Sequence, residues 1–208
     1  MTPAPLPAVL PILQYLDYLG IAVFAVSGAL LAAQKRQTFV TFVFLATATG
    51  IGGGTLRDLL IGAPVFWVHQ NWTLVICVAA ALIVWFTSGR FWGRAGLVWF
   101  DAVGLAAYAT YGTAKGLTYG AAHLPAFGMG VLTACAGGII RDLLADEPSI
   151  LLRPELYVTA AAVSSGLMVL FSVCGVPAPV AGLMAAAVGF ALRGLAIAKG
   201  WSLPTYHR

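Results

Sequence analysis

Charged side chains are scarce in this sequence: only 9% of its 208 residues are Asp, Glu, Lys or Arg, whereas 61% are hydrophobic. A soluble globular domain carries roughly 25% charged residues. With a mean hydropathy of +0.93, the chain has too few charges to cover a water-facing surface, so its main solvent must be lipid. The net charge of +4 therefore does not indicate nucleic-acid binding, and we expect none.

The sequence also lacks the residue patterns that catalysis and cofactor binding require. Its three cysteines and three histidines are scattered, without the spacing of metal ligands or of a nucleophile beside a base. The glycine-rich stretch at 50–54 has no Gly-Lys-Ser/Thr ending, and Thr55 stands where a dinucleotide fingerprint has its third glycine. We therefore expect no enzyme activity, no metal and no cofactor.

What the sequence does contain is a series of apolar stretches separated by short connectors rich in Gly, Pro and charged residues. A spanning helix takes about 20 residues, and the pattern predicts an all-α membrane protein with seven transmembrane helices. We expect these helices near residues 12–34, 38–62, 71–89, 96–116, 122–145, 155–174 and 177–198.

The basic residues fall almost entirely on one side of this predicted topology. Only Lys115 lies on the other side. Those in alternate connectors and the C-terminal tail are Lys35, Arg36, Arg90, Arg94, Arg153, Arg193, Lys199 and Arg208. Because Lys and Arg concentrate in cytoplasmic loops, we expect the N-terminus outside and the C-terminus in the cytoplasm.

One phrase occurs twice: Gly52-Gly-Gly-Thr-Leu-Arg-Asp-Leu-Leu60 and Ala136-Gly-Gly-Ile-Ile-Arg-Asp-Leu-Leu144. The copies are 84 residues apart, and other polar, Gly and Pro residues repeat at the same offset without a gap. Each copy holds three spans, so the second enters the membrane from the opposite side. We expect a repeat at 12–89, its inverted copy at 96–174, and a seventh helix at 177–198 in one membrane domain. Such repeats often place a solute site near the membrane midplane, although duplication can also simply build a stable bundle.

The glycines of this phrase lie in the middle of the second and fifth helices. Each interior glycine costs roughly 1 kcal/mol relative to alanine, which predicts a kink or an unwound turn that acts as a gate. Backbone groups freed there must be buried in protein or line water. The alternative is close helix packing through small residues. The residues concerned are Gly52, Gly53 and Gly54, and Gly137 and Gly138.

Ionisable side chains follow the glycines in both copies: Arg57 and Asp58, and Arg141 and Asp142. A charge inside a span costs about 2.5–3.5 kcal/mol on insertion scales and usually marks an ion or substrate path. We expect these four residues to line an ion pathway. One alternative is that each arginine extends to its own interface. Another is structural salt bridges between neighbouring helices, because adjacent residues on a helix point in different directions.

Two further repeated pairs are candidate site residues. Asp17 and Asp101 are expected near the starts of their helices, either as favourable charges at a helix N-terminus or as carboxylates at the two pore mouths. Thr49 and Thr133 precede the glycines by one turn. Their hydroxyls are expected either to bind the opened backbone within the pathway or to bond back within their own helix.

The doubled Gly-rich helix ending in Arg-Asp-Leu-Leu, within a three-plus-three-plus-one layout, resembles the prokaryotic branch of the trimeric intracellular cation (TRIC) channels. The resemblance covers residues from about Asp17 to Arg193 and implies a homotrimer in a prokaryotic plasma membrane, with one hourglass pore in each protomer. Helices two and five would line that pore, kinked at the glycines named above. The expected partners are monovalent cations, including potassium, and membrane lipids. One departure is Ala136, which replaces the first glycine of the second triplet and implies a shallower kink.

Three functions follow as hypotheses from these residues and this resemblance. The first is a potassium-permeable monovalent cation channel. The second is a secondary transporter of a small neutral solute such as an amino acid, because inverted repeats with broken helices suit it equally, and related sequences carry the label of glycine transporters. The third is a structural or assembly protein whose glycines only permit close packing.

Overall fold

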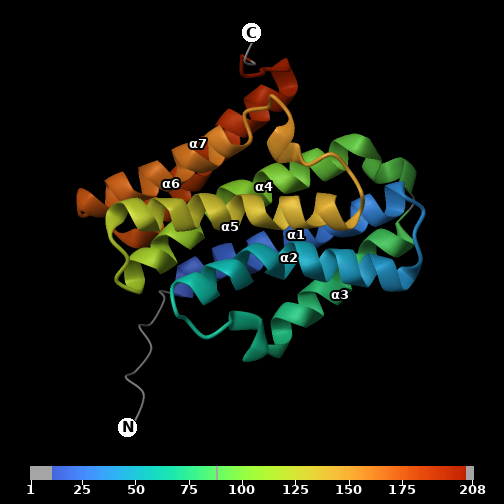
Figure 1. Cartoon of the computed structure of the whole chain (residues 1–208), viewed down its shortest axis with the longest axis horizontal. Coiled ribbons are helices and arrows are strands. Elements are labelled where there is room, and N and C mark those ends of the chain that lie inside the picture. Colours follow the sequence, from blue (N-terminus) through green and yellow to red (C-terminus); the bar gives the residue numbers. More distant parts are fainter. Residues whose placement is uncertain (1–10, 88, 205–208) are drawn as a thin grey trace.

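The computed structural model describes residues 11–87 and 89–204, and within them the side chains of residues 15–87 and 95–204. These residues form seven α-helices, confirming the predicted all-α architecture, together with two short 3-10 turns. The elements are α1 (Pro11–Gln34), α2 (Phe39–Leu60), η1 (Phe66–Val68), α3 (Asn71–Phe86), α4 (Gly89–Thr118), α5 (His123–Leu144), η2 (Ile150–Leu152), α6 (Val158–Val173) and α7 (Ala178–Lys199). The helices lie side by side in one bundle (Figure 1).

The fourth helix differs most from its predicted bounds. It begins at Gly89 and runs for 30 residues, whereas the glycines and arginines of 88–94 predicted a connector there. Glycine weakens a helix interior by only about 1 kcal/mol, and arginine is a good helix former, so this stretch continues the helix instead of ending it. The third helix is correspondingly shorter than predicted and ends at Phe86.

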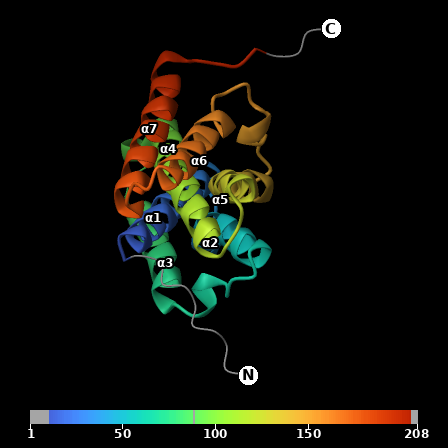
Figure 2. The ribbon, with the colours of Figure 1, turned by 90° about the vertical axis from the view of Figure 1, so that its left-hand side faces the viewer.

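Four helices are long and apolar enough to cross a membrane by length and composition alone, namely α1 from Tyr15 onward, α2, α5 and α7. The helices α3 and α6 are apolar but have only 16 residues each. These two short helices are repeat mates, the third span of each half. Helix α3 packs against α1 and α2, and α6 packs against α4, α5 and α7; in Figure 2 α3 lies low in the view and α6 higher.

The inverted repeat is visible in reciprocal contacts between α1 and α4. A Cβ atom added to Gly20 of α1 would collide with the ring of Tyr108 on α4. The repeat mate of this contact joins Gly104 of α4 to Phe24 of α1, where the added atom would lie 2.9 Å from the ring. The two rings also meet each other, with centroids 5.3 Å apart. Each half therefore contributes one aromatic ring and one glycine, and each ring packs against the glycine of the other half.

A second reciprocal contact joins α2 to α5. A Cβ on Gly53 would collide with the backbone oxygen of Thr133, and a Cβ on Gly137 would lie 2.7 Å from the backbone oxygen of Thr49. Gly53 and Thr49 in one half correspond to Gly137 and Thr133 in the other. The helices approach this closely because glycine has no side chain, as small residues permit between membrane helices. Both helices remain continuous through their glycines.

Candidate functional site

The first group of buried charges, here called the Arg57 cluster, comprises Asp17, Arg57, Asp58, Tyr111 and Lys115. Asp58 Oδ1 accepts from Arg57 Nε at 2.8 Å and lies 2.7 Å from Arg57 Nη2. The same oxygen accepts from Lys115 Nζ at 2.7 Å. The side chains of Arg57 and Asp58 have 0% exposure. One carboxylate oxygen thus holds two cations that come from two different helices.

Aromatic rings surround this cluster. The guanidinium carbon of Arg57 lies 4.8 Å from the ring centroid of Tyr111 and 5.9 Å from that of Phe66. Such cation–π contacts stabilise a desolvated cation by about 2 kcal/mol. Asp17 is buried close enough to interact electrostatically with Arg57. Among the described residues, however, Asp17 Oδ1 and Arg57 Nη1 have no hydrogen-bond partner.

The second group, the Arg141 cluster, comprises Ser27, Asp101, Arg141 and Asp142. Arg141 Nη1 donates to Asp101 Oδ1 at 2.6 Å and to the Ser27 hydroxyl at 2.8 Å. Its Nε and Nη2 donate to Asp142 Oδ1 at 2.9 and 2.8 Å. Arg141 therefore joins three helices, α1, α4 and α5, through charge-assisted hydrogen bonds, the stronger kind in proteins.

The two clusters share one backbone arrangement. The second carboxylate oxygen of Asp58 accepts from the amide of Phe66 at 3.1 Å, and that of Asp142 accepts from the amide of Ile150 at 2.9 Å. Phe66 and Ile150 are the first residues of η1 and η2. Each aspartate thus fixes the loop that follows its helix, and the Arg-Asp phrase has a structural role in both halves.

A cavity lies beside the Arg141 cluster. It has a volume of about 430 Å³ and is here called the Arg141 vestibule. Its lining includes Leu31, Leu97, Arg141, Asp142, Arg153 and Glu155. At the corresponding place beside the Arg57 cluster the repeat mate of Leu31 is Lys115, whose ammonium group is bound to Asp58. A leucine in one half is therefore replaced by a cluster-forming lysine in the other.

The structure decides between several interpretations of the four repeated charges. Extension of each arginine to its own interface is wrong, because Arg57 and Arg141 are 0% and 1% exposed. Salt bridges between neighbouring helices are present, since Arg141 of α5 pairs with Asp101 of α4 and Asp58 of α2 pairs with Lys115 of α4. Each arginine also bonds its sequence neighbour, which the expectation of diverging side chains did not include. A long arginine side chain can fold back along its helix and reach a carboxylate that starts in another direction. Their role in permeation stays a prediction.

The glycine triplets contain no unwound turn, because α2 and α5 are helical from Phe39 to Leu60 and from His123 to Leu144. Close packing, the alternative reading, is what the glycines provide here. Thr49 and Thr133 bond back within their own helices, to the carbonyls of Leu45 at 2.6 Å and Met129 at 2.5 Å. A bend that keeps these helices intact, and its use as a gate, stay predictions.

Asp17 and Asp101 do not lie in the first turns of their helices. Helix α1 begins at Pro11 and α4 at Gly89, so the helix-terminus interpretation is wrong. Both carboxylates are buried, with 5% and 1% exposure. Each belongs to one of the two charge clusters, and their assignment to pore mouths stays a prediction.

Three charged residues of these sites were not among the predicted ones. Lys115 is 6% exposed inside α4, although it was predicted at the far end of the fourth span, on the side opposite the other basic residues. Arg193, counted as a cytoplasmic connector residue, is 1% exposed within α7 and pairs with Glu155. One signal marked Lys115: it was the single basic residue that broke the charge asymmetry.

The remaining basic residues give partial support to the predicted orientation. Lys35 and Arg153 are on the same end of the bundle, near the Arg141 vestibule, and Lys35 Nζ lies 2.9 Å from Glu147 Oε1. The side chains of Arg90 and Arg94, and all of Arg208, lie outside the described residues. Which membrane face this end of the bundle meets stays a prediction.

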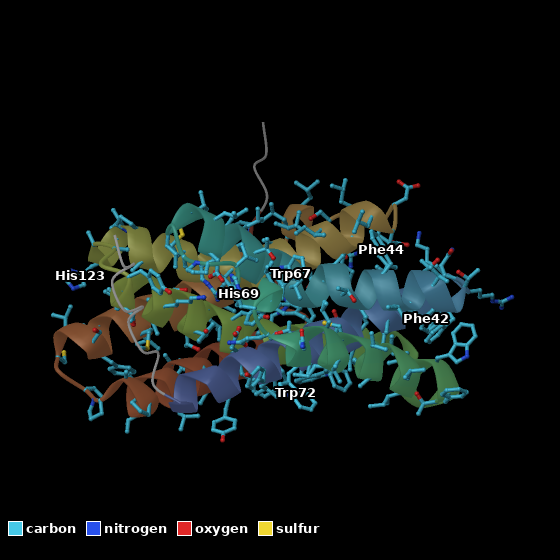
Figure 3. The ribbon with its side chains drawn as sticks, turned by 90° about the horizontal axis from the view of Figure 1, so that it is seen from below. Phe42, Phe44, Trp67, His69, Trp72 and His123 are labelled. Atoms are coloured by element: carbon cyan, nitrogen blue, oxygen red, sulfur yellow. The ribbon has the colours of Figure 1, made fainter. Side chains whose placement is uncertain are left out.

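Within the described part of the chain, no group of three His, Cys, Asp or Glu side chains is placed to hold a metal ion. His69 and His123 lie well apart, with His123 at one extremity of the bundle (Figure 3). Trp67, beside His69, donates from its indole nitrogen to the Thr55 hydroxyl at 3.0 Å. Cys77 and Cys135 are buried, whereas Cys174, at the end of α6, is exposed.

The described residues thus form a seven-helix membrane bundle built from two inverted three-helix repeats, with a charge cluster around each Arg-Asp phrase. The family model described as Glycine transporter matches residues 14–88 and 98–173, which are the two repeats. The chain belongs to this family.

Curated relatives carry family names without a stated activity. The chain is 37% identical over 200 residues to the UPF0126 inner membrane protein YadS of Escherichia coli (strain K12), an alignment that covers 94% of this chain and 96% of that protein. It is 38% identical over 154 residues to a UPF0126 membrane protein of Vibrio cholerae, covering 72% of this chain and 64% of that protein. The chain is thus an integral membrane protein with an inner-membrane relative.

Solved structures link the fold to cation channels. The TRIC trimeric intracellular cation channel orthologue from Rhodobacter sphaeroides superposes with a TM-score of 0.85 at 36% identity, covering 92% of this chain and all of that one. A prokaryotic TRIC channel solved in 0.5 M KCl gives a TM-score of 0.83 at 27% identity, with 92% and 98% coverage. The chain is a homologue of the TRIC channels, in agreement with the resemblance of its repeated phrase, and its solved relatives are channels, not enzymes.

Proposed function

We propose that this protein is a potassium-permeable channel for monovalent cations, with the ion pathway inside each protomer between α2 and α5. The observation that carries the proposal is that the two charge clusters occupy the ends of the two helices that meet at reciprocal glycine contacts. A route along α2 and α5 therefore has a group of carboxylates near each end and small residues between them.

The geometry corresponds to a closed form of such a channel. At the centre, Gly53 and Gly137 bring the two backbones together, and the Tyr108 hydroxyl donates to the carbonyl of Gly50 at 2.8 Å. At the Arg57 end, Asp58 is occupied by Arg57 and Lys115. A cation reaches Asp58 only after Lys115 moves away, so Lys115 closes that end.

The arginines have a definite place in this proposal. Arg57 and Arg141 each hold an aspartate in a fixed position and neutralise it in the closed form. Buried ion pairs of this kind bring two charges into the membrane at a smaller cost than one alone. Opening exchanges part of the arginine–carboxylate contact for water and a passing cation, which gives preference for cations without a permanent free charge.

The direct test is single-channel recording of purified protein in planar bilayers. In a potassium chloride gradient we expect discrete currents whose reversal potential lies close to the potassium equilibrium potential. Asp58→Asn and Asp142→Asn should move that potential toward zero, with Glu147→Gln as a control on an exposed carboxylate. Silence of the wild type across voltages and calcium concentrations would contradict the channel proposal.

The alternative is a secondary transporter for a small neutral solute such as an amino acid. The observation that favours it is the cavity of about 430 Å³ beside the Arg141 cluster, which is a candidate site for such a solute. Saturable, ion-coupled uptake into proteoliposomes without unitary currents would favour this function over the channel.

We further propose that the protein assembles as a homotrimer within the lipid bilayer, with the N-terminus outside and the C-terminus in the cytoplasm. The similarity to trimeric channels supports the assembly, and Lys35 and Arg153 near the Arg141 end support the orientation. Native mass spectrometry of the detergent-solubilised protein should give the trimer mass. Cysteine labelling from either side of right-side-out vesicles should reach the Arg141 end only from the inside.

A further inference from the structure

Helix α7 lies outside the inverted repeat, yet it contacts the wall of the Arg141 vestibule. Arg193 of α7 is 1% exposed, and its Nη2 donates to Glu155 Oε2 at 2.5 Å. Its guanidinium carbon also lies 5.5 Å from the ring centroid of Tyr157. Glu155 and Tyr157 belong to the segment between η2 and α6. A buried cation of the seventh helix thus holds the loop that follows the second Arg-Asp phrase.

Glu155 borders two cavities. It lines the Arg141 vestibule and also a second cavity of about 260 Å³, whose lining includes Arg193, Trp201 and Ser202. Val98 of α4 lines both cavities as well. The segment around Glu155 therefore forms part of the wall of both cavities, and the second cavity is space into which it can move.

The chain after α7 turns back and fastens this wall a second time. Gly200 has a φ of +66°, in the left-handed region that glycine adopts readily. The chain then runs beside the loop before α6, where Leu203 N donates to the Pro154 carbonyl at 2.7 Å and Ser202 forms a β-bridge with Glu155. Figures 1 and 2 both show the end of the chain passing close to this loop.

The other repeat cannot form the same connection. The repeat mate of Glu155 is Asn71, an uncharged and exposed residue at the start of α3. An amide cannot replace the carboxylate in an ion pair with a buried arginine. The fastening of the vestibule wall is therefore a property of one end of the molecule only.

We propose that Arg193 and residues 201–203 form a latch that holds the 153–155 segment against α7 and keeps the Arg141 vestibule narrow. Arg193 and Glu155 act as positioning residues: they set the place of the wall. Release of the latch lets the segment move into the second cavity and widens the vestibule. The effect on current rests on the proposed function, whereas the change in vestibule access does not.

Access can be measured without current by labelling a cysteine in the vestibule. Leu31→Cys places a thiol at a lining position that is 5% exposed, in a Cys174→Ser background because Cys174 is the exposed native cysteine. Leu203→Pro removes the N–H that bonds Pro154, and Leu203→Ala keeps it. With a membrane-impermeant thiosulfonate reagent, the proline variant should label about fivefold faster than the alanine variant, as the loss of one backbone hydrogen bond implies. Equal rates would overturn the latch.

A second pair of variants tests the ionic part and guards against misfolding of the proline variant. Glu155→Gln removes the charge that Arg193 holds, and Glu147→Gln removes a carboxylate of the same vestibule that pairs with Lys35 instead. Labelling of Leu31→Cys should rise with Glu155→Gln and stay unchanged with Glu147→Gln. If both variants changed the labelling rate equally, the net charge of the vestibule would explain the effect. That result would overturn the role of Arg193.

The two proposals fail in different ways. If the wild type conducts no cations in bilayers while the labelling rates differ as expected, the channel function is wrong and the latch stands. If the wild type conducts and Leu203→Pro changes neither labelling rate nor open probability relative to Leu203→Ala, the latch is wrong and the channel stands.

Discussion

The two charge clusters contain the same Arg-Asp phrase, yet they differ in the side chains that surround them, and a cavity lies beside the Arg141 cluster. Arg57 and Arg141 each bond the neighbouring aspartate, and each aspartate holds the first amide of a following 3-10 turn. The difference lies in what surrounds them. At the Arg57 end a lysine of α4 joins the cluster; at the Arg141 end its repeat mate is a leucine of α1, which leaves the carboxylate beside a cavity.

The clusters also differ in how fully their polar atoms are satisfied. Arg141 reaches Asp101, Asp142 and Ser27 with its donors, although Asp101 Oδ2 has no hydrogen-bond partner among the described residues; in the Arg57 cluster both Arg57 Nη1 and Asp17 Oδ1 have none. A buried polar atom without a partner costs about 1–3 kcal/mol. The duplicated phrase therefore fixes where charge enters the membrane, and the residues around it determine how fully the polar atoms of each cluster are paired.

The largest effect that would test this comparison is expected for Asp58→Asn. The substitution leaves Arg57 and Lys115 buried with only Asp17 nearby, and removing one partner from a buried ion pair costs about 3–5 kcal/mol. Asp142→Asn is the matched change, and it should cost clearly less because Arg141 keeps Asp101 at 2.6 Å and faces a cavity. Thermal unfolding in detergent measures both. Equal losses of Tm would show that the two clusters are equivalent in energy.

The next effect concerns the contact between α2 and α5. In Gly53→Ala the new Cβ meets the backbone oxygen of Thr133, which cannot turn away as a side chain can. Overpacking of this kind costs about 1–3 kcal/mol, and the helices must separate slightly. Gly52→Ala is a close control, because its Cβ meets only the end of the Ile140 side chain, at 2.6 Å.

Both variants are compared by Tm and by open probability. Gly53→Ala should lower Tm and change open probability, while ion preference stays the same because the charged residues are untouched. Gly128→Ala, whose Cβ meets nothing within 4 Å, shows the effect of helix propensity alone. A normal Tm and open probability for Gly53→Ala would contradict a gate at this crossing.

Much of this architecture could be predicted because local sequence patterns determine it. Apolar length gave the seven helices, and the 84-residue offset gave the inverted repeat and the four charges of the Arg-Asp phrases. The pairing inside the clusters was beyond such patterns. Lys115 bonds Asp58 across 57 residues of sequence, and no local pattern connects the two residues.

The glycines show a related limit of pattern. Interior glycines predict a weakened helix, yet helix α2 gains from Gly53 a packing contact with α5 that no alanine permits, and it stays continuous. Tertiary contact thus reverses the inference from propensity alone. The vestibule could not be predicted from local patterns either. Its wall contacts α7, which belongs to neither repeat and does not contain the repeated phrase.

A smaller effect on stability is expected from Lys115→Leu, which gives the Arg57 end the residue that the Arg141 end has at the same position. Asp58 keeps Arg57 at 2.7 Å, so one hydrogen bond to a charged group is lost and the burial of one charge is avoided. We expect these terms nearly to cancel, leaving a net change in stability of about 1 kcal/mol or less. Open probability should increase, because the side chain that closes Asp58 is gone.

The converse change, Leu31→Lys, should lower current by placing an ammonium group beside Asp142. The effects of Lys115→Leu and Leu31→Lys are compared by recording currents at both voltage polarities. If the Arg57 end becomes no more conductive with leucine, and the Arg141 end no less conductive with lysine, this position does not set the difference between the two ends.

The smallest effect is expected at the surface of the same vestibule. Lys35 and Glu147 pair at 2.9 Å, with side chains 31% and 33% exposed, and solvent-exposed pairs contribute about 0–1 kcal/mol. Glu147→Gln should therefore shift Tm by no more than a degree or two, and raising the salt concentration should reduce even that difference, since screening acts on exposed charges. The buried cluster variant Asp58→Asn should keep its Tm loss in high salt, because the Arg57 and Asp58 side chains have 0% exposure. A salt-insensitive loss for Glu147→Gln would place this carboxylate with the buried clusters and make the vestibule rim part of the ionic core.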